Sequence, residues 1–197
     1  MSKTQFSKSK EYILFLKKLL KNPKNIGALF PSSNRLGNLM AKHVPSKENS
    51  LIVEVGGGTG RLSSALLRNG INPDHLYIIE LDSTFVEYLK NHLSPKVHIL
   101  QGDAAQLDAI IPKKICGKVD IIISALPLIN MKSETKKKIL QSYLKILRPQ
   151  GIILQFTYGM TSPISEKEIP LEKQRVGYVL QNFPPATIWK YWRKPIS

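Results

Sequence analysis

LIVEVGGGTGRLSSALL, residues 51–67, is the stretch from which the fold of this chain follows. Its first five residues are typical of a buried strand, and its last seven repeat apolar side chains at the spacing of a helix. Four glycines in five positions lie between these two parts. Glycine lets the backbone turn at positive φ and lets a ligand approach the main chain, because no Cβ is in the way. The stretch predicts a strand, a loop suited to a phosphate or a nucleoside, and a helix.

Strand-like and helix-like segments alternate along the chain. The predicted strands are residues 51–55, 76–80, 97–101, 119–124 and 151–157, and the predicted helices are residues 61–69, 83–92, 104–111 and 134–147. This alternation indicates βαβ units, and therefore a parallel sheet with helices on both faces. The segment RPQG at 148–151 is expected to stop the last of these helices.

The pattern changes after Tyr158. Residues 159–175 contain two prolines and have weak periodicity, and residues 176–193 form two β-rich runs joined by a Pro-Pro turn. Two strands joined so closely must be antiparallel. With 197 residues, 42% of them hydrophobic, and no internal repeat or linker, the chain is expected to form one α/β domain over residues 1–197.

The glycine loop distinguishes between nucleotide-binding designs. A Walker loop ends in Gly-Lys-Ser/Thr, but here Gly60 is followed by Arg61. A dinucleotide fingerprint G-x-G-x-x-G would need a glycine at that same position. The pattern that fits is E-x-G-x-G-x-G, formed by Glu54, Gly56, Gly58 and Gly60. It is the first motif of the S-adenosylmethionine-dependent methyltransferases with a Rossmann-like sheet.

Polar residues at the ends of the next two predicted strands extend this hypothesis. Glu80, with Leu81 after it, ends the second strand 20 residues beyond Gly60, where a carboxylate accepts hydrogen bonds from ribose hydroxyls. The third strand ends in QGDAAQL, in which Gly102–Ala104 is similar to the adenine-contacting turn of that class, with Asp103 as acceptor. The alternative is that Asp103 only caps the following helix. These features are expected to face one crevice at the carboxyl ends of the strands.

The fourth predicted strand ends in ISALPLIN, where the substrate amine is expected to bind. Amino-group methyltransferases often have Asn or Asp there, followed by Pro-Pro and an aromatic residue. This chain has Ser124 in place of the amide or acid, then Leu126 and Pro127, and the aliphatic Leu128 where an aromatic ring would stack on a base. The missing stacking platform argues against a nucleobase substrate.

Six segments together resemble the bacterial phospholipid N-methyltransferases, which methylate phosphatidylethanolamine toward phosphatidylcholine. They are NPKNIGALFPSSNRLGNLMA (22–41), VEVGGGTG, GDAAQL, SALPLI, LQFTYGMTSP (154–163) and VGYVLQNFPPATIWKYWR (176–193). The resemblance implies a class I fold with a mostly parallel seven-stranded sheet, S-adenosylmethionine as cofactor and S-adenosylhomocysteine as product. The type is distantly similar to the ribosomal RNA adenine dimethyltransferases. This chain departs from the usual pattern at Gly57, where proline is more familiar, and in the short segment before the last hairpin.

The resemblance also implies roles for residues outside the glycine loop. Carbonyl groups of the loop from Ser124 to Pro127, together with Tyr158, would orient the amine while water removes its proton, and Ser124 would also contact the cofactor. Tyr158 could equally be a core residue. Ser32 and Ser33 precede a helical pattern, so they are expected either to cap that helix or to face the cofactor carboxylate or a lipid phosphate.

The charge of the chain favours a polyanionic partner. It has 29 Lys and Arg against 14 Asp and Glu, a formal net charge of +15. Nucleic acid and the anionic inner leaflet of a membrane both fit such a field, and so does a merely soluble lysine-rich surface. Residues 1–24 hold seven lysines and one glutamate. When residues 10–21 are arranged as a helix, their apolar side chains occupy an arc of about 160°, and lysines lie on the opposite side. This pattern is expected of a helix that docks on a membrane or of one that packs on the protein core.

Other compositional features exclude several classes of site. The single Cys116 excludes an internal disulfide, and His43, His75, His92 and His98 have no metal-ligand spacing, so no metal is expected. No stretch approaches the roughly 20 apolar residues of a membrane span, and lysines interrupt the first apolar run, so no secretory signal is predicted. The expected location is cytoplasmic, peripheral to the inner face of the membrane. An RNA methyltransferase and a non-enzymatic membrane-associated protein are the alternatives.

Overall fold

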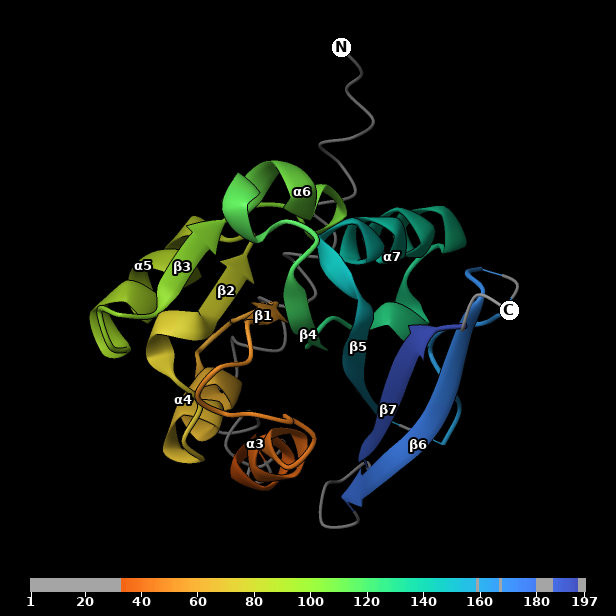
Figure 1. Ribbon diagram of the computed structural model, residues 1–197, viewed down its shortest axis with the longest axis horizontal. Helices are drawn as coiled ribbons and strands as arrows, with labels where there is room; N and C mark the ends of the chain where they lie inside the picture. The colour runs from red at the N-terminus through yellow and green to blue at the C-terminus, as the bar shows by residue number, and fades with distance from the viewer. Residues whose placement is uncertain (1–32, 159, 167, 180–185, 195–197) are drawn as a thin grey trace.

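A seven-stranded sheet forms the centre of the computed structural model, which describes residues 33–158, 160–166, 168–179 and 186–194. The strand order is β3-β2-β1-β4-β5-β7-β6 (Figure 1). Strands β1 (Ile52–Val55), β2 (Leu76–Glu80), β3 (His98–Gln101), β4 (Val119–Ser124) and β5 (Leu147–Tyr158) are parallel. Strand β7 (Ala186–Arg193) pairs antiparallel with β5 and with β6 (Leu171–Val179). The predicted class I methyltransferase sheet with its antiparallel hairpin is confirmed.

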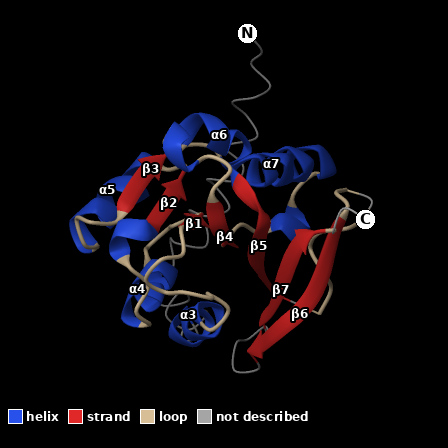
Figure 2. Ribbon diagram, in the orientation of Figure 1, coloured by secondary structure: helices blue, strands red, loops and turns tan. Residues whose placement is uncertain are grey.

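Helices cover both faces of the sheet (Figure 1 and Figure 2). Helices α3 (Ser33–Ala41), α4 (Arg61–Arg68) and α5 (Ser83–His92) lie on one face, and α6 (Leu107–Ile110) and α7 (Ser133–Ile146) lie on the other. Four short 3-10 turns complete the described elements, at Pro73–His75, Ala104–Gln106, Lys113–Ile115 and Leu128–Asn130. The basic head, residues 1–24, lies outside the described residues.

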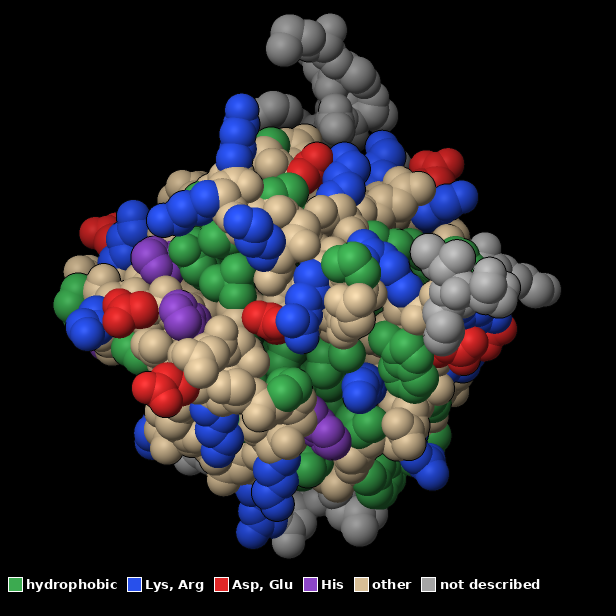
Figure 3. Space-filling view, viewed as in Figure 1, with side chains coloured by type: hydrophobic (Ala, Val, Ile, Leu, Met, Phe, Trp, Pro, Cys, Tyr) green, Lys and Arg blue, Asp and Glu red, His purple; other side chains and the backbone are tan. Residues whose placement is uncertain are grey.

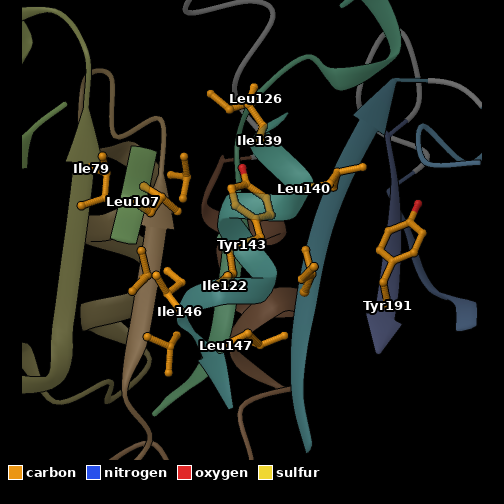
Figure 4. Close-up of a cluster of buried hydrophobic side chains, with 14 of the residues drawn as sticks. Ile79, Leu107, Ile122, Leu126, Ile139, Leu140, Tyr143, Ile146, Leu147 and Tyr191 are labelled. Carbon is orange, nitrogen blue, oxygen red and sulfur yellow. The ribbon is translucent and has the colours of Figure 1, made fainter. Parts of the chain in front are cut away.

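The two faces have separate apolar cores, which explains why the central strands are continuous apolar runs. On β1, Val53 and Val55 pack on the side of α7, while Ile52 packs on the side of α3 and α4. A strand buried on both faces loses the alternation of polar and apolar residues. Tyr143 lies within the core on the α7 side, and its hydroxyl points toward the end of the cluster where Leu126 lies (Figure 4).

The start of β5 differs from the prediction. The strand begins at Leu147, not at residue 151, so RPQG belongs to it. A register shift against β4, between Val119 and Ile121, accommodates the extra residues, including Pro149, which has no amide hydrogen for a ladder bond. The predicted end of the helix at 147 is nearly right, because α7 ends at Ile146. The Arg193 side chain from β7 donates to the carbonyl groups of Leu144, Leu147 and Arg148 at that end.

Two other boundaries also differ. Residues 104–111, predicted as one helix, form a 3-10 turn followed by the short α6. Strand β6 begins at Leu171, inside the segment whose weak periodicity predicted no strand. Among the described strands, this edge strand pairs with β7 alone, and its residues Lys173–Arg175 are exposed, so its composition lacks an apolar pattern.

Candidate active site

The predicted site residues at the ends of β1, β2, β3 and β4 lie together at the carboxyl edge of the sheet. The chain continues from β1 to β2 on one side, whereas β4 lies on the other side, so the strand order reverses at β1. Val55 is paired with both Ile79 and Ser124, and Glu80 is paired with Gln101. Open α/β sheets bind ligands in the crevice at such a reversal. The glycine loop, the turn after β3 and the loop after β4 all begin there.

The glycine loop needs its glycines for conformational reasons. Gly56, Gly58 and Gly60 have φ values of 88°, 51° and 70°, in the left-handed region. A Cβ on Gly56 would come within 2.9 Å of the Leu126 Cδ2 atom, so the loop after β4 lies directly against this one. A Cβ on Gly58 would have no atom of a described residue within 4 Å. The backbone at Gly58 therefore faces open space.

Gly57, the departure from the usual proline, has a packing reason. A Cβ there would lie 2.5 Å from the Ile78 Cγ2 atom and 2.9 Å from the Leu89 Cδ1 atom. These two side chains occupy the volume that a larger residue at position 57 would require. The glycine is therefore matched to Ile78 and Leu89 of this chain.

Glu80 holds the glycine loop against the end of β2. Only 3% of the residue is exposed. Its Oε2 atom accepts the Gly58 amide at 2.8 Å, and its Oε1 atom accepts the amides of Leu81 at 2.8 Å and Asp82 at 3.0 Å. A carboxylate has about four acceptor sites. The Oε2 atom, which accepts one of these three hydrogen bonds, can therefore accept one more, and it lies beside the Gly58 backbone.

Glu54 is a fully buried acid without a normal hydrogen-bond partner. The residue is 0% exposed, and neither carboxyl oxygen makes a hydrogen bond of normal geometry to a described residue. Burial raises the pKa of Glu54 to about 8; the nearby Ser63 hydroxyl opposes this rise, and the charge of Glu80 adds to it. An unpartnered buried acid is costly. The site is therefore suited to a cationic group that would pair with the ionised form.

The buried Glu54 should make stability depend on pH. Its pKa is raised from 4.5 to about 8 by folding, so between these values the unfolded chain releases a proton that the folded chain keeps. The free energy of unfolding should therefore fall as the pH rises through this window and level off above it. Relative to Glu54→Gln, which has no such proton, the ligand-free protein should lose about 2 kcal/mol between pH 6 and pH 8 in urea unfolding. Parallel pH profiles for the two proteins would contradict the assignment.

The turn after β3 has the capping geometry that the sequence left open. The Asp103 Oδ1 atom accepts the Ala105 amide at 2.9 Å, so Asp103 caps the turn that begins at Ala104. The Gly102 amide donates to the Glu80 carbonyl at 2.9 Å, which holds the turn beside the end of β2. A Cβ on Gly102 would come within 2.2 Å of the Ile110 Cδ1 atom. The glycine is thus required by the packing of Ile110.

The loop after β4 is held by several hydrogen bonds. Ser124 is 0% exposed, and its hydroxyl accepts a hydrogen bond from the Tyr143 hydroxyl at 3.0 Å, which directs it toward α7. The Leu126 carbonyl accepts the Leu128 amide at 2.8 Å across Pro127, whose φ of −77° and ψ of 63° form an inverse γ-turn. Leu128 is 1% exposed and belongs to the core. It therefore offers no platform for a base.

Gln155 is a site residue that the sequence analysis missed. It is paired with Ser124 across the β4–β5 ladder and is 0% exposed. Its Nε2 atom donates to the Leu126 carbonyl at 2.9 Å. The available signal was a single amide inside the apolar run IILQFT. Its partner could not be foreseen, because Leu126 is distant in sequence.

Tyr158, Ser32 and Ser33 complete the predicted set. Burial raises the pKa of Tyr158, so its phenol stays protonated at neutral pH and is a donor, not a base. Its ring packs edge-on against Phe156, with centroids 6.0 Å apart. Ser32 lies outside the described residues, and Ser33 is the first residue of α3.

Helix α3 runs in the same direction as α4, which begins at the glycine loop. A Cβ on Gly37 would lie 2.2 Å from the Ala65 Cβ atom, and the Asn69 side chain donates to the Asn38 side chain at 2.5 Å. The Asn72 amide, beyond the end of α4, donates to the Lys47 carbonyl, beyond the end of α3, at 2.9 Å, so the two helices end on the same side. The first turn of α3 is accordingly directed toward the glycine-loop end of α4.

Two negative findings apply to the described part of the chain. Within it, no group of three or more His, Cys, Asp and Glu side chains is placed to hold a metal ion. None of the helices described there combines the length and apolar composition that crossing a bilayer requires.

Comparison with known proteins identifies similar chains. Residues 52–151 match the family model described as methyltransferase domain. The chain is 26% identical over 151 residues to an ornithine lipid N-methyltransferase of Singulisphaera acidiphila, covering 75% of this chain and 78% of that protein. It is 36% identical over 87 residues to ribosomal RNA small subunit methyltransferase A of Shewanella sediminis, covering 43% of this chain and 32% of that protein.

Solved structures share the fold at low sequence identity. A TehB-like SAM-dependent methyltransferase from Corynebacterium glutamicum has a TM-score of 0.64 at 14% identity, covering 92% of this chain and 99% of that one. A SAM-dependent methyltransferase from Aquifex aeolicus has a TM-score of 0.61 at 17% identity, covering 86% and 97%. The likeness therefore extends over most of both chains in each case.

Proposed function

Since this chain belongs to the methyltransferase domain family, we propose that it methylates the amine of a phospholipid headgroup, phosphatidylethanolamine or its mono- and dimethyl derivatives, toward phosphatidylcholine. The chain is an S-adenosylmethionine-dependent methyltransferase. The observation that carries the lipid substrate is the similarity to a lipid N-methyltransferase over 75% of this chain and 78% of that protein. The ribosomal RNA methyltransferase match covers 43% of this chain and 32% of that protein.

The described residues fit the cofactor. Within the part of the chain that the structure describes, no atom covers the backbone at Gly58, and Glu54 is a buried acceptor without a hydrogen-bond partner. In our proposal Glu54 and Glu80, the amides of the glycine loop, Leu81 and the turn from Gly102 to Ala104 hold S-adenosylmethionine, with Ser32, Ser33 and Ser124 at its edges. When bound, it supplies an electrophilic methyl group on a sulfonium.

The protein's own task is to align and dry the amine, because methyl transfer is an in-line displacement by a lone pair. A primary ammonium must first lose a proton, and the protonated Tyr158 phenol cannot take it. We assign proton removal to water. Both lone pairs of the Leu126 carbonyl accept hydrogen bonds, from Leu128 and Gln155. We therefore assign the amine to the Ala125 carbonyl, while Leu126 and Pro127 shape the loop.

The loop after β4 supports a headgroup substrate over a nucleobase. The residue at the aromatic position, Leu128, is buried at 1% exposure, whereas its neighbour Ile129 is 46% exposed. Base recognition in flipped or single-stranded nucleic acid relies on stacking against aromatic side chains. An aliphatic surface at this place suits the glycerol and acyl part of a lipid.

Charge supports action at an anionic membrane surface. The net charge is +15. Figure 3 shows Lys and Arg side chains spread over the face in view, with fewer Asp and Glu between them. We propose that the protein associates peripherally with the inner face of the membrane, and that residues 1–24, which lie outside the described residues, are its docking element.

A labelling experiment tests this function. The full chain is incubated with methyl-labelled S-adenosylmethionine and either ribosomal RNA or liposomes of phosphatidylethanolamine and phosphatidylglycerol. Label should enter a chloroform-soluble product at least tenfold faster than RNA. Label found in the RNA alone would overturn the proposal.

The same assay examines docking through a charge reversal. The variant Lys17→Glu with Lys18→Glu should bind and methylate the liposomes at least about thirtyfold less well, since each of the two lysines lost from an anionic surface contributes about 1 kcal/mol. The matched control reverses the exposed pair Lys113 and Lys114. Equal losses in both variants would mean that overall charge, not the head, attracts the membrane.

A further inference from the structure

Gln155 is a buried side-chain amide that holds the loop proposed to receive the amine. Its Nε2 atom lies 2.9 Å from the Leu126 carbonyl and 2.6 Å from the Phe156 carbonyl. Both neighbours are acceptors, so the nitrogen must face them. The amide therefore has one arrangement in this site, with its two donors directed at two backbone oxygens.

The oxygen atom of this amide adds a cost in folding free energy. The Gln155 Oε1 atom is buried and has no hydrogen-bond partner among the described residues. A buried acceptor without a donor costs about 1–3 kcal/mol. An apolar side chain of the same size would avoid this cost, so stability of the core does not by itself account for a glutamine here.

The hydrogen bond is made at the turn that gives the loop its shape. Pro127 occupies the inverse γ-turn that the Leu128 amide closes on the Leu126 carbonyl. A single three-residue turn of this kind is weak by itself. The Gln155 side chain on the neighbouring strand β5 donates a second hydrogen bond to the same Leu126 carbonyl and fixes its position. Ala125, just before the turn, is itself tied to β1 by its amide, which donates to the Val55 carbonyl at 2.9 Å.

A further hydrogen bond fixes Ser124, the residue before Ala125. The Tyr143 hydroxyl from α7 donates to the Ser124 hydroxyl, and burial raises the pKa of Tyr143, so this donor stays protonated. Ala125 thus lies between a residue held by α7 and a residue held by β5. Its position relative to the glycine loop is determined from both sides.

We propose that Gln155 is a positioning residue for methyl transfer, which holds the Leu126 peptide so that the neighbouring Ala125 carbonyl is in place for the substrate amine. This inference rests on the proposed function for the identity of the amine. The amide does not touch the reacting atoms. Its effect is to limit the motion of the loop from Ser124 to Leu128.

The first test measures the loop without any substrate. Gln155→Met keeps the length of the side chain and removes its donors, so amide hydrogen exchange in the peptide covering residues 124–130 should become about tenfold faster, the effect of losing one buried hydrogen bond. The control is Thr157→Val, a buried polar residue on the same strand. Unchanged exchange in folded Gln155→Met, or an equal change in Thr157→Val, would overturn the proposal.

The second test measures catalysis. With liposomes as substrate, Gln155→Met should lower kcat about tenfold while the affinity for S-adenosylmethionine, measured by calorimetry, stays within twofold. Faster exchange with unchanged kcat would refute the catalytic part of the inference. If the unmodified chain methylates no lipid, the proposed function is wrong. The exchange experiment still tests whether Gln155 limits the motion of the loop.

A third variant provides a rescue and covers the case in which Gln155→Met does not fold. Gln155→Glu has the same shape but can donate only when its carboxyl group is protonated. Loop exchange, corrected for the intrinsic pH dependence, and the loss of kcat should both increase as the pH rises through the titration of that group. A side chain with only a packing role would produce no such pH dependence relative to the unmodified chain, and that result would overturn the proposal.

Discussion

Replacing Gly58 with valine is expected to weaken S-adenosylmethionine binding by about a hundredfold or more while leaving the protein folded. The Cβ would have no atom of a described residue within 4 Å, so no described part of the protein core is displaced. The space it enters is where the cofactor must approach the backbone. Overpacking of a fitted site costs about 1–3 kcal/mol, and a branched side chain against a rigid loop is at the upper end.

The chain offers a matched control for the backbone strain. Gly58 has a φ of 51°, and Gly117 has a φ of 75° with no atom of the described part of the chain within 4 Å of its added Cβ. Valine at either place adopts a left-handed conformation at a cost of roughly 1–2 kcal/mol. Gly117 precedes β4 at the opposite edge of the sheet. Thermal unfolding should shift alike in the two variants, and only Gly58→Val should lose binding in titration calorimetry; equal affinities would remove the glycine loop from the cofactor site.

Glu80→Ala is expected to weaken cofactor binding by about a hundredfold. A hydrogen bond to a charged group contributes about 1.5–3 kcal/mol, and the carboxylate is proposed to accept from the ribose. The substitution also frees the amides of Gly58, Leu81 and Asp82, which the carboxylate now holds. The loop loses its anchor at the same time as the ligand loses its acceptor.

The control for charge is Glu87→Ala, on the exposed face of α5. It changes the net charge equally and leaves the carboxyl edge untouched. Calorimetric titration of both folded variants with S-adenosylmethionine decides the matter. An affinity for Glu80→Ala equal to that of Glu87→Ala would remove Glu80 from the cofactor site.

Much of the sheet followed from local pattern. The runs that became β1, β2 and β4 are buried on both faces, so they are mostly apolar segments, with Glu54 and Asp120 as exceptions inside β1 and β4, and their ends were predicted within one residue. Glu54, the glycines and Glu80 were found because a tight loop and a strand end require particular residue types at fixed spacing. These requirements are local, and the sequence contains them.

The parts that were missed depend on contacts between distant residues. Strand β5 begins four residues early because a register shift against β4 takes up RPQG, and α7 ends where Arg193 caps it. Gly102 has the pattern of a ligand turn, but its lack of a Cβ is required by Ile110. In each case the deciding atom belongs to another element.

The sequence alone determined the chemistry of this protein: a glycine loop between a strand and a helix, acids at strand ends, and the class of cofactor they serve. It could do so because backbone conformation and residue type are properties of short segments. Only the tertiary structure decided which polar groups are already satisfied. The Ser124 hydroxyl accepts from Tyr143, the Leu126 carbonyl is held by Gln155, and Glu54 has no partner of normal geometry among the described residues, because burial and hydrogen bonding are set by side chains that folding brings together.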